Sequence, residues 1–114
     1  MKDIMPCLRE KNRYIVYKIK SSIKLNQKST KNGLYSEMLR FLGEFDLAKA
    51  SLKIMEDWDN QIGIIKTNNK YKDKVISSII LIDQIGNKNV NVGTIKVSGT
   101  LKKARNYIKE HKGG

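Results

Sequence analysis

The stretch SLKIMEDWDNQIGIIKT, residues 51–67, lies near the middle of the chain and decides its fold class. Apolar and other side chains alternate over residues 51–56, which predicts a strand. Residues 57–60 have the Asp- and Asn-rich composition of a turn. Residues 62–67 are rich in β-branched side chains and predict a second strand. The stretch therefore predicts a β-hairpin.

Segments with helical spacing lie on both sides of this hairpin. Before it, apolar residues recur on one helical face from Leu34 to Phe45. Thr30 is the expected N-cap of this helix and Gly43 its expected end. Residues 21–32 are polar without a strong period, and we expect a long connection there. After the hairpin, residues 72–85 carry a broad Ile- and Val-rich face and predict a second helix.

Two further strands and a last helix complete the pattern. Residues 13–20 are β-branched and aromatic and predict the first strand. Residues 90–97 predict the last strand, and a change of parity among their apolar residues predicts a bulge near Gly93. Thr100 is expected to cap a basic helix over residues 100–112.

The order β-α-β-β-α-β plus a terminal helix is that of a split βαβ arrangement. We therefore expect an α+β, ferredoxin-like and RRM-like two-layer sandwich with a four-stranded antiparallel sheet and both central helices packed on it. The chain of 114 residues, 1–114, is expected to be a single domain, with residues 1–12 as an extended basic segment. In this topology the first and last strands lie near each other, so the two ends of the chain share one region of surface.

Charge is concentrated at these two ends. Residues 1–31 carry nine Lys or Arg and two Asp or Glu, and residues 99–112 carry five and one. The stretch between them holds nine basic and eight acidic side chains, although the whole chain has a formal net charge of +12. Two basic segments around a balanced centre indicate one electropositive surface, for which RNA or DNA is the first expected partner.

Several classes of protein are excluded by composition. No apolar run approaches the roughly 20 residues of a membrane span, and the N-terminus has no apolar signal region. One cysteine and one histidine, Cys7 and His111, cannot form an internal disulfide or a zinc finger. The sequence contains no recognisable set of catalytic side chains, so we expect no catalytic residue, no bound metal and a cytoplasmic location.

Two groups of residues are candidates for RNA binding from the sequence alone. Arg13 and Tyr14 place a cation and an aromatic ring on the first strand, whereas Tyr17 has the opposite parity and is expected in the core. The stretch SGTLKKAR, residues 98–105, joins a small-residue turn to a basic helix start, an arrangement that favours anions. The third strand contains no aromatic residue, so conventional base stacking across the sheet is not expected.

Three stretches resemble the archaeal ribonuclease P component 2 family, whose eukaryotic relatives serve ribonucleases P and MRP. They are PCLREKNRYI at residues 6–15, IIKT at residues 64–67 and VSGTLKKA at residues 97–104. The third stretch is the most specific. The family usually has Pro-Pro-Thr where residues 5–7 read Met-Pro-Cys, and Arg where Lys66 stands, which removes a planar fork for phosphate.

The resemblance implies a role in a ribonucleoprotein. In this family the RNA subunit removes the 5′ leader from precursor tRNA by Mg²⁺-dependent hydrolysis, and the protein supports the catalytic domain of that RNA. The resemblance also implies that the protein forms a heterodimer with a larger TIM-barrel-like subunit, component 3, and that two such heterodimers can associate. The resulting hypothesis is that basic residues neutralise crowded phosphates and lower the Mg²⁺ requirement. The expected RNA-binding residues are Arg9, Lys11, Arg13, Tyr14, Lys66, Ser98, Gly99, Thr100, Lys102, Lys103 and Arg105.

Three other functions remain open at this point. A ribosomal or other RNA-assembly protein would bind RNA without any link to cleavage. A ferredoxin-like regulatory module would bind a small ligand, and a DNA-binding module would prefer duplex DNA.

Overall fold

The computed structural model describes residues 11–59, 61–86 and 88–111. Its elements, in chain order, are β1 Asn12–Ser21, α1 Gln27–Ala50, β2 Lys53–Asp59, β3 Ile62–Asn68, α2 Lys72–Leu81, β4 Gln84–Ile85, β5 Lys88–Ser98 and α3 Leu101–His111. The mixed α+β class expected from the sequence is confirmed. None of these helices is both long and apolar enough to cross a membrane.

The sheet has five strands in the order β2-β3-β1-β5-β4, and every pairing in it is antiparallel. The expected sheet of four strands is therefore wrong in one detail. Residues 84–85 pair with the start of β5 instead of continuing α2, so α2 ends at Leu81 and not at residue 85. The expected closeness of the first and last long strands is confirmed, because β1 lies between β3 and β5.

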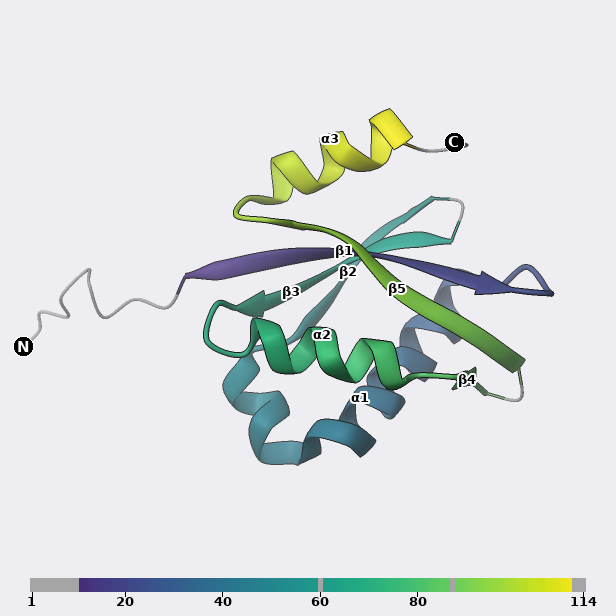
Figure 1. Cartoon of the computed structure of the whole chain (residues 1–114), viewed down its shortest axis with the longest axis horizontal. Helices are drawn as coiled ribbons and strands as arrows, with labels where there is room; N and C mark the ends of the chain where they lie inside the picture. Colours follow the sequence, from purple (N-terminus) through teal and green to yellow (C-terminus); the bar gives the residue numbers. More distant parts are fainter. Residues whose placement is uncertain (1–10, 60, 87, 112–114) are drawn as a thin grey trace, which may run out of the picture.

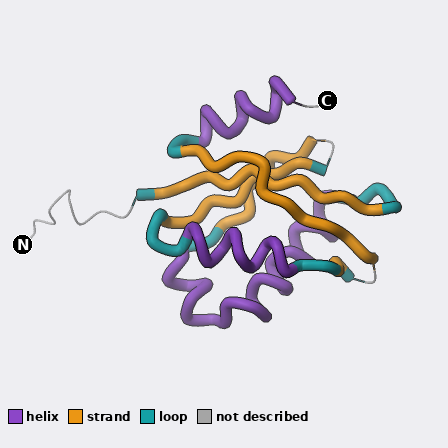
Figure 2. The backbone as a smooth tube through the Cα atoms, viewed as in Figure 1, coloured by secondary structure: helices purple, strands orange, loops and turns teal. Residues whose placement is uncertain are grey.

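The helices lie on opposite faces of the sheet, as Figures 1 and 2 show: α1 and α2 cover one face and α3 lies across the other. Strand alternation supplies both faces with apolar side chains. The larger core under α1 and α2 contains Ile15, Tyr17 and Ile65. A smaller core under α3 contains Val16 and Ile64 from the same strands. The sheet with α1 and α2 forms the two layers that were expected, and α3 adds a third layer that was not, so the sheet lies in the middle.

Helix α1 begins earlier and ends later than expected. Asn26, not Thr30, is its N-cap, because the Asn26 side chain accepts a hydrogen bond of 2.9 Å from the Ser29 backbone N–H. Thr30 is buried one turn later, and its hydroxyl donates to the Asn26 carbonyl. Gly43, at φ 82° and ψ 165°, kinks the helix and does not end it, since helical geometry resumes and continues to Ala50.

The bulge predicted near Gly93 lies two residues further on. In the pairing of β1 with β5, Val16 is opposite Lys96 while Tyr17 is opposite Thr94, so Ile95 is the extra residue. The extra residue shifts the alternation of β5 by one position. Val92 and Val97 therefore both lie on the α1–α2 face, although an odd number of positions separates them. The bulge also turns Lys96 to the α3 face, opposite Val16.

Candidate nucleic-acid interface

Three of the predicted RNA-binding residues form one row across the sheet. Tyr14 of β1 is directly opposite Lys66 of β3 on one side and Ser98 of β5 on the other. Lys53 of β2 is opposite Lys66 and extends the row. Because residues in one row across a sheet share a face, all four side chains start from the α3 face. Residues far apart in the sequence thus meet at one end of the sheet.

The beginning of the described chain is tied to the same end. The Asn69 backbone N–H donates to the Lys11 carbonyl over 2.6 Å, which joins the segment before β1 to the turn after β3. The Lys11 side chain is exposed there. The last turn of α1 is held at this end as well, because the Thr67 hydroxyl donates to the Ala50 carbonyl over 2.9 Å.

The start of α3 adds two exposed lysines, Lys102 and Lys103. The predicted cap is confirmed, because the Thr100 hydroxyl accepts a hydrogen bond of 3.2 Å from the Lys103 backbone N–H. Gly99 leaves the approach to this turn open, since a side chain there would meet no atom within 4 Å. The Thr100 cap satisfies one N–H of the helix start, and Lys102 and Lys103 add positive charge beside it.

Arg105 lies in the same helix but has a carboxylate partner. Its guanidinium contacts Asp57 of β2 through two bonds, Nε to Oδ2 at 2.8 Å and Nη2 to Oδ1 at 3.3 Å. The hydrogen bond to Asp57, reinforced by its charge, raises the pKa of the Arg105 guanidinium above its ordinary value. This pair holds α3 against the sheet, a contact that sequence analysis did not predict because 48 residues separate the partners.

The two candidates on β1 face opposite sides of the sheet. Tyr14 is half-buried and packs against the smaller core at the start of α3. Arg13 has the parity of Ile15, so it starts from the α1–α2 face at the same end of the sheet, and its Nη1 donates to the Asn12 carbonyl. Arg9 lies outside the described residues, as does most of the predicted extended segment 1–12.

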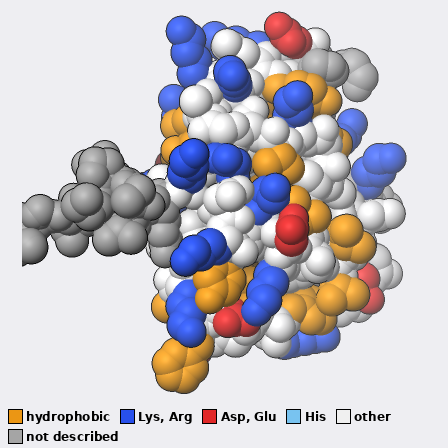
Figure 3. All heavy atoms as spheres, turned by 60° about the vertical axis from the view of Figure 1, so that its left-hand side comes forward, with side chains coloured by type: hydrophobic (Ala, Val, Ile, Leu, Met, Phe, Trp, Pro, Cys, Tyr) orange, Lys and Arg blue, Asp and Glu red, His pale blue; other side chains and the backbone are white. Residues whose placement is uncertain are grey.

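Strand alternation also places basic residues from the near-neutral central stretch of the chain on the α3 face. Lys53 and Lys96 are exposed there, and the Lys96 ammonium lies 5.8 Å from the centre of the Tyr107 ring. The alternation of β2 and β5 was the signal that could have identified them. Figure 3 shows one side of the molecule on which Lys and Arg side chains greatly outnumber acidic ones.

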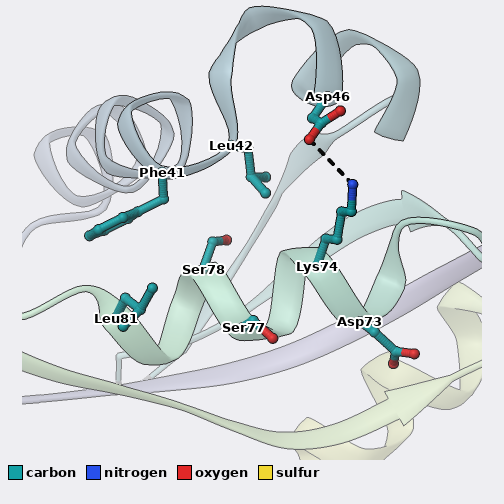
Figure 4. A pocket seen from close by; sticks show the side chains of 8 residues that line it. All are labelled: Phe41, Leu42, Asp46, Asp73, Lys74, Ser77, Ser78 and Leu81. Atoms are coloured by element: carbon teal, nitrogen blue, oxygen red, sulfur yellow. Dashed lines mark hydrogen bonds and ion pairs between the residues drawn. The ribbon is translucent and has the colours of Figure 1, made fainter.

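A second kind of surface lies on the helical layer. A groove of about 430 Å³ runs between α1 and α2, and its apolar lining residues are Phe41, Leu42 and Leu81. Its charged lining residues are Asp46, Asp73 and Lys74, of which Lys74 contacts Asp46 over 3.5 Å (Figure 4). The neighbouring helical surface also exposes Ile80 and, at 84%, Phe45. Within the described ranges, no group of three or more His, Cys, Asp or Glu side chains is arranged to hold a metal ion.

The fold and its surface define a class of protein: a small α+β protein whose antiparallel sheet is backed by two helices and carries a basic surface at one end. Within that class the chain belongs to the Rpp14/Pop5 family, whose model matches residues 13–109. The resemblance inferred from the sequence is confirmed by this match.

Relatives of similar length support the family membership. A protein of Pyrococcus furiosus named ribonuclease P protein component 2 is 33% identical over 105 residues, which cover 91% of this chain and 88% of the relative. A protein of the same name from Archaeoglobus fulgidus is 33% identical over 95% of this chain and 98% of the relative. A chain in a cryo-EM structure of yeast ribonuclease MRP has the same fold, with a TM-score of 0.63 at 18% identity over 90% of this chain and 88% of that one.

Proposed function

We propose that this chain is a protein subunit of ribonuclease P, the ribonucleoprotein endonuclease that removes the 5′ leader from precursor tRNA. The proposal is supported by the match to archaeal component 2 proteins, which covers nearly the whole length of this chain and of each relative. The observation that carries it is structural: the fold brings the basic start of β1, the end of β3 and the start of α3 to one end of the sheet. RNA is the partner that such a surface fits best.

In this proposal the RNA subunit carries out Mg²⁺-dependent hydrolysis and this chain contributes positive potential. RNA phosphates repel each other where strands crowd in the catalytic domain, and bound Mg²⁺ reduces that repulsion. Lys11, Lys66, Lys102 and Lys103 replace part of this ionic atmosphere and release counterions when they bind. Arg105 has a different role, because its bond to Asp57 fixes the helix that presents the two lysines.

The helical layer is the proposed contact for the TIM-barrel-like subunit, component 3, with which this chain would form a cytoplasmic heterodimer that can pair with a second one. Protein interfaces have apolar centres depleted in charge, and the groove between α1 and α2 fits that description better than the lysine-rich α3 face does. RNA and the protein partner would then bind opposite faces of one sheet.

The phosphate role is tested by changing Lys102 and Lys103 to Gln together, while Arg105 is kept so that α3 stays in place. Cleavage of precursor tRNA by the reconstituted enzyme is measured across a Mg²⁺ series. We expect the Mg²⁺ concentration for half-maximal cleavage to rise. The control, Lys24→Gln with Lys28→Gln, removes the same charge near the start of α1 and should leave that concentration unchanged. An equal Mg²⁺ requirement in all three proteins would contradict the proposal.

The partner surface is tested by Leu81→Glu, which puts a charge at the end of the groove. Leu81 is 57% exposed, so the free protein should fold normally, whereas capture of component 3 should weaken by tenfold or more, about 1.4 kcal/mol. Ile23→Glu is the matched control, since Ile23 is 55% exposed and precedes α1. Equal capture by both variants would show that the partner binds elsewhere.

A further inference from the structure

Five lysines start from the face of the sheet on which α3 lies. Lys18 and Lys20 of β1 alternate with buried Ile19, and they have the parity of Val16, which belongs to the small core under α3. Lys66 has the parity of Ile64, and Lys53 that of Met55, both in contact with the same core. Lys96 is opposite Val16. The α3 face thus carries the lysines Lys18, Lys20, Lys53, Lys66 and Lys96.

Helix α3 divides these lysines into two groups. Arg105 on one flank contacts Asp57 of β2, and Tyr107 on the other flank lies under Lys96 of β5. Arg105 and Tyr107 are two positions apart, which in a helix is a rotation of about 200° around the axis. Their contacts therefore mark opposite sides of α3. We name the group toward β2 and β3 the first lane, made of Lys53 and Lys66. The second lane is made of Lys96 of β5 and of Lys18 and Lys20 of β1, which lie opposite Gly93 and Asn91 of β5. On its β3 side Lys18 lies opposite Ile62, which is buried in the small core under α3, so the open side of Lys18 is toward β5.

Each lane is extended by a lysine of α3 and is open to large ligands. Lys102 precedes Arg105 by three residues and faces the first lane, and Lys103 precedes Tyr107 by four and faces the second. Beside the second lane, β5 places Gly93 opposite Lys18, where a side chain would meet no atom within 4 Å. On the described strands of this face the acidic residues are Asp57, which Arg105 holds, and Asp59 at the hairpin.

We propose that α3 lies between two phosphate backbones, so that this face binds a double-stranded segment of RNA with one strand along each lane. The proposal rests on the proposed function and specifies the form of RNA. A single strand can occupy only one lane, because a helix of about 10–12 Å diameter separates them. The minor groove of A-form RNA is wide and shallow enough to receive such a ridge, whereas its major groove is deep and narrow. The crest of α3 is polar and exposed at Asn106, between the flanks marked by Arg105 and Tyr107, which suits a groove lined by 2′-hydroxyls.

The test uses the whole chain with a short blunt-ended RNA duplex, one strand of that duplex alone, and a DNA duplex of the same sequence. The first-lane variant changes Lys53 and Lys66 to Gln, and the second-lane variant changes Lys18 and Lys96 to Gln. The control is again Lys24→Gln with Lys28→Gln. Affinity is measured over a salt series, and the unfolding midpoint of each variant verifies that it folds.

On the RNA duplex we expect each lane variant to reduce the steepness of log affinity against log salt by about 1.8, the value for two lost phosphate contacts at roughly 0.9 each. The combined variant should lose both contributions, and the control should lose neither. A duplex whose binding depends on one lane alone would overturn the proposal, and so would equal binding of the single strand. Equal, lane-dependent binding of the DNA duplex would overturn the assignment to RNA, since the major groove of B-DNA also admits a helix.

The outcome separates this inference from the proposed function. A one-lane result together with a raised Mg²⁺ requirement in the Lys102 and Lys103 variant removes the duplex and leaves the ribonuclease P subunit. Two-lane binding together with an unchanged Mg²⁺ requirement keeps duplex RNA as the ligand and removes the proposed role in cleavage.

Discussion

Tyr17 is one of the largest buried side chains of the larger core. It is almost fully buried in β1 and lies opposite Gly63 of β3, so that the phenol ring occupies the space above that glycine. A Cβ at residue 63 would collide with the ring and its hydroxyl. Glycine is therefore required at this point by the packing of its neighbour.

Replacing Gly63 with Ala is expected to destabilise the fold by about 1–3 kcal/mol, because the ring must leave a well-packed position. Denaturant unfolding measures the difference in free energy. Gly93→Ala is the control, since a side chain there meets open space and should cost far less. Equal stability of the two variants would mean that the ring yields without cost.

The buried phenol also predicts a pH dependence. Burial raises the pKa of Tyr17 above its ordinary value, because the phenolate would lose its hydration. The unfolded chain ionises this group near pH 10, whereas the folded chain does not, so the unfolded state is favoured as pH rises above that value. We expect stability to fall by up to about 1.4 kcal/mol per pH unit from this residue. The free energy of unfolding of Tyr17→Phe should fall less steeply between pH 9.5 and 11, roughly the range where ordinary phenols titrate. Tyr35→Phe, which changes an exposed tyrosine, should show the same pH dependence as the wild type.

Single residues also show where sequence analysis succeeded. Tyr17 was expected in the core and is there, because strand parity is a local property. Arg105 was grouped with the lysines predicted to bind phosphate, but its contact with Asp57 depends on how α3 returns across the sheet. Such a contact follows from tertiary structure and has no signal in the sequence near either residue.

Among the elements, the strands were predicted better than the helix boundaries. The hairpin of β2 and β3 and the last strand were found from alternation, and even the bulge was placed within two residues of Ile95. The first turns of α1 were missed, because residues 27–32 are nearly all polar and their stability comes from the Asn26 cap and buried Thr30. Gly43 was expected to end the helix and only kinks it.

Helix α3 is attached to the sheet by a small core and by side-chain contacts at its two flanks. Besides the small core around Ala104 and Ile108, it is held by the pair between Arg105 and Asp57, in which the arginine side chain is 51% exposed. Asp57→Asn should increase hydrogen exchange in α3 by a few-fold while the sheet stays protected, since the charge that orients Arg105 is lost.

Glu56→Gln is the control for this change, because Glu56 is the neighbouring carboxylate and pairs with Lys31 of α1. Added salt should loosen α3 in the wild type and in the control, but have less effect in Asp57→Asn, where the ion pair is already absent. Identical exchange of α3 in all proteins would show that the pair between Arg105 and Asp57 does not hold it.

At the scale of the whole molecule, the fold gathers basic residues from separate parts of the sequence on one face of the sheet. The predicted meeting of the two basic ends is supported by the pairing of β1 with β5, which places Tyr14 beside Ser98 at the start of α3. Composition alone assigned the central lysines to a balanced segment, whereas the alternation of the strands sends Lys53, Lys66 and Lys96 to the α3 face. The α1–α2 layer on the other face carries the groove with the apolar residues Phe41, Leu42 and Leu81 and the ion pair between Lys74 and Asp46.

The most direct measurement is a lysine footprint of the whole chain, in which amines are acetylated with and without the ribonuclease P RNA and each site is quantified by mass spectrometry. We predict strong protection of Lys66, Lys96, Lys102 and Lys103, and no protection of Lys24 and Lys28, the two control lysines at the α1 side. Protection spread evenly over all lysines, or confined to those near the start of α1, would contradict the account.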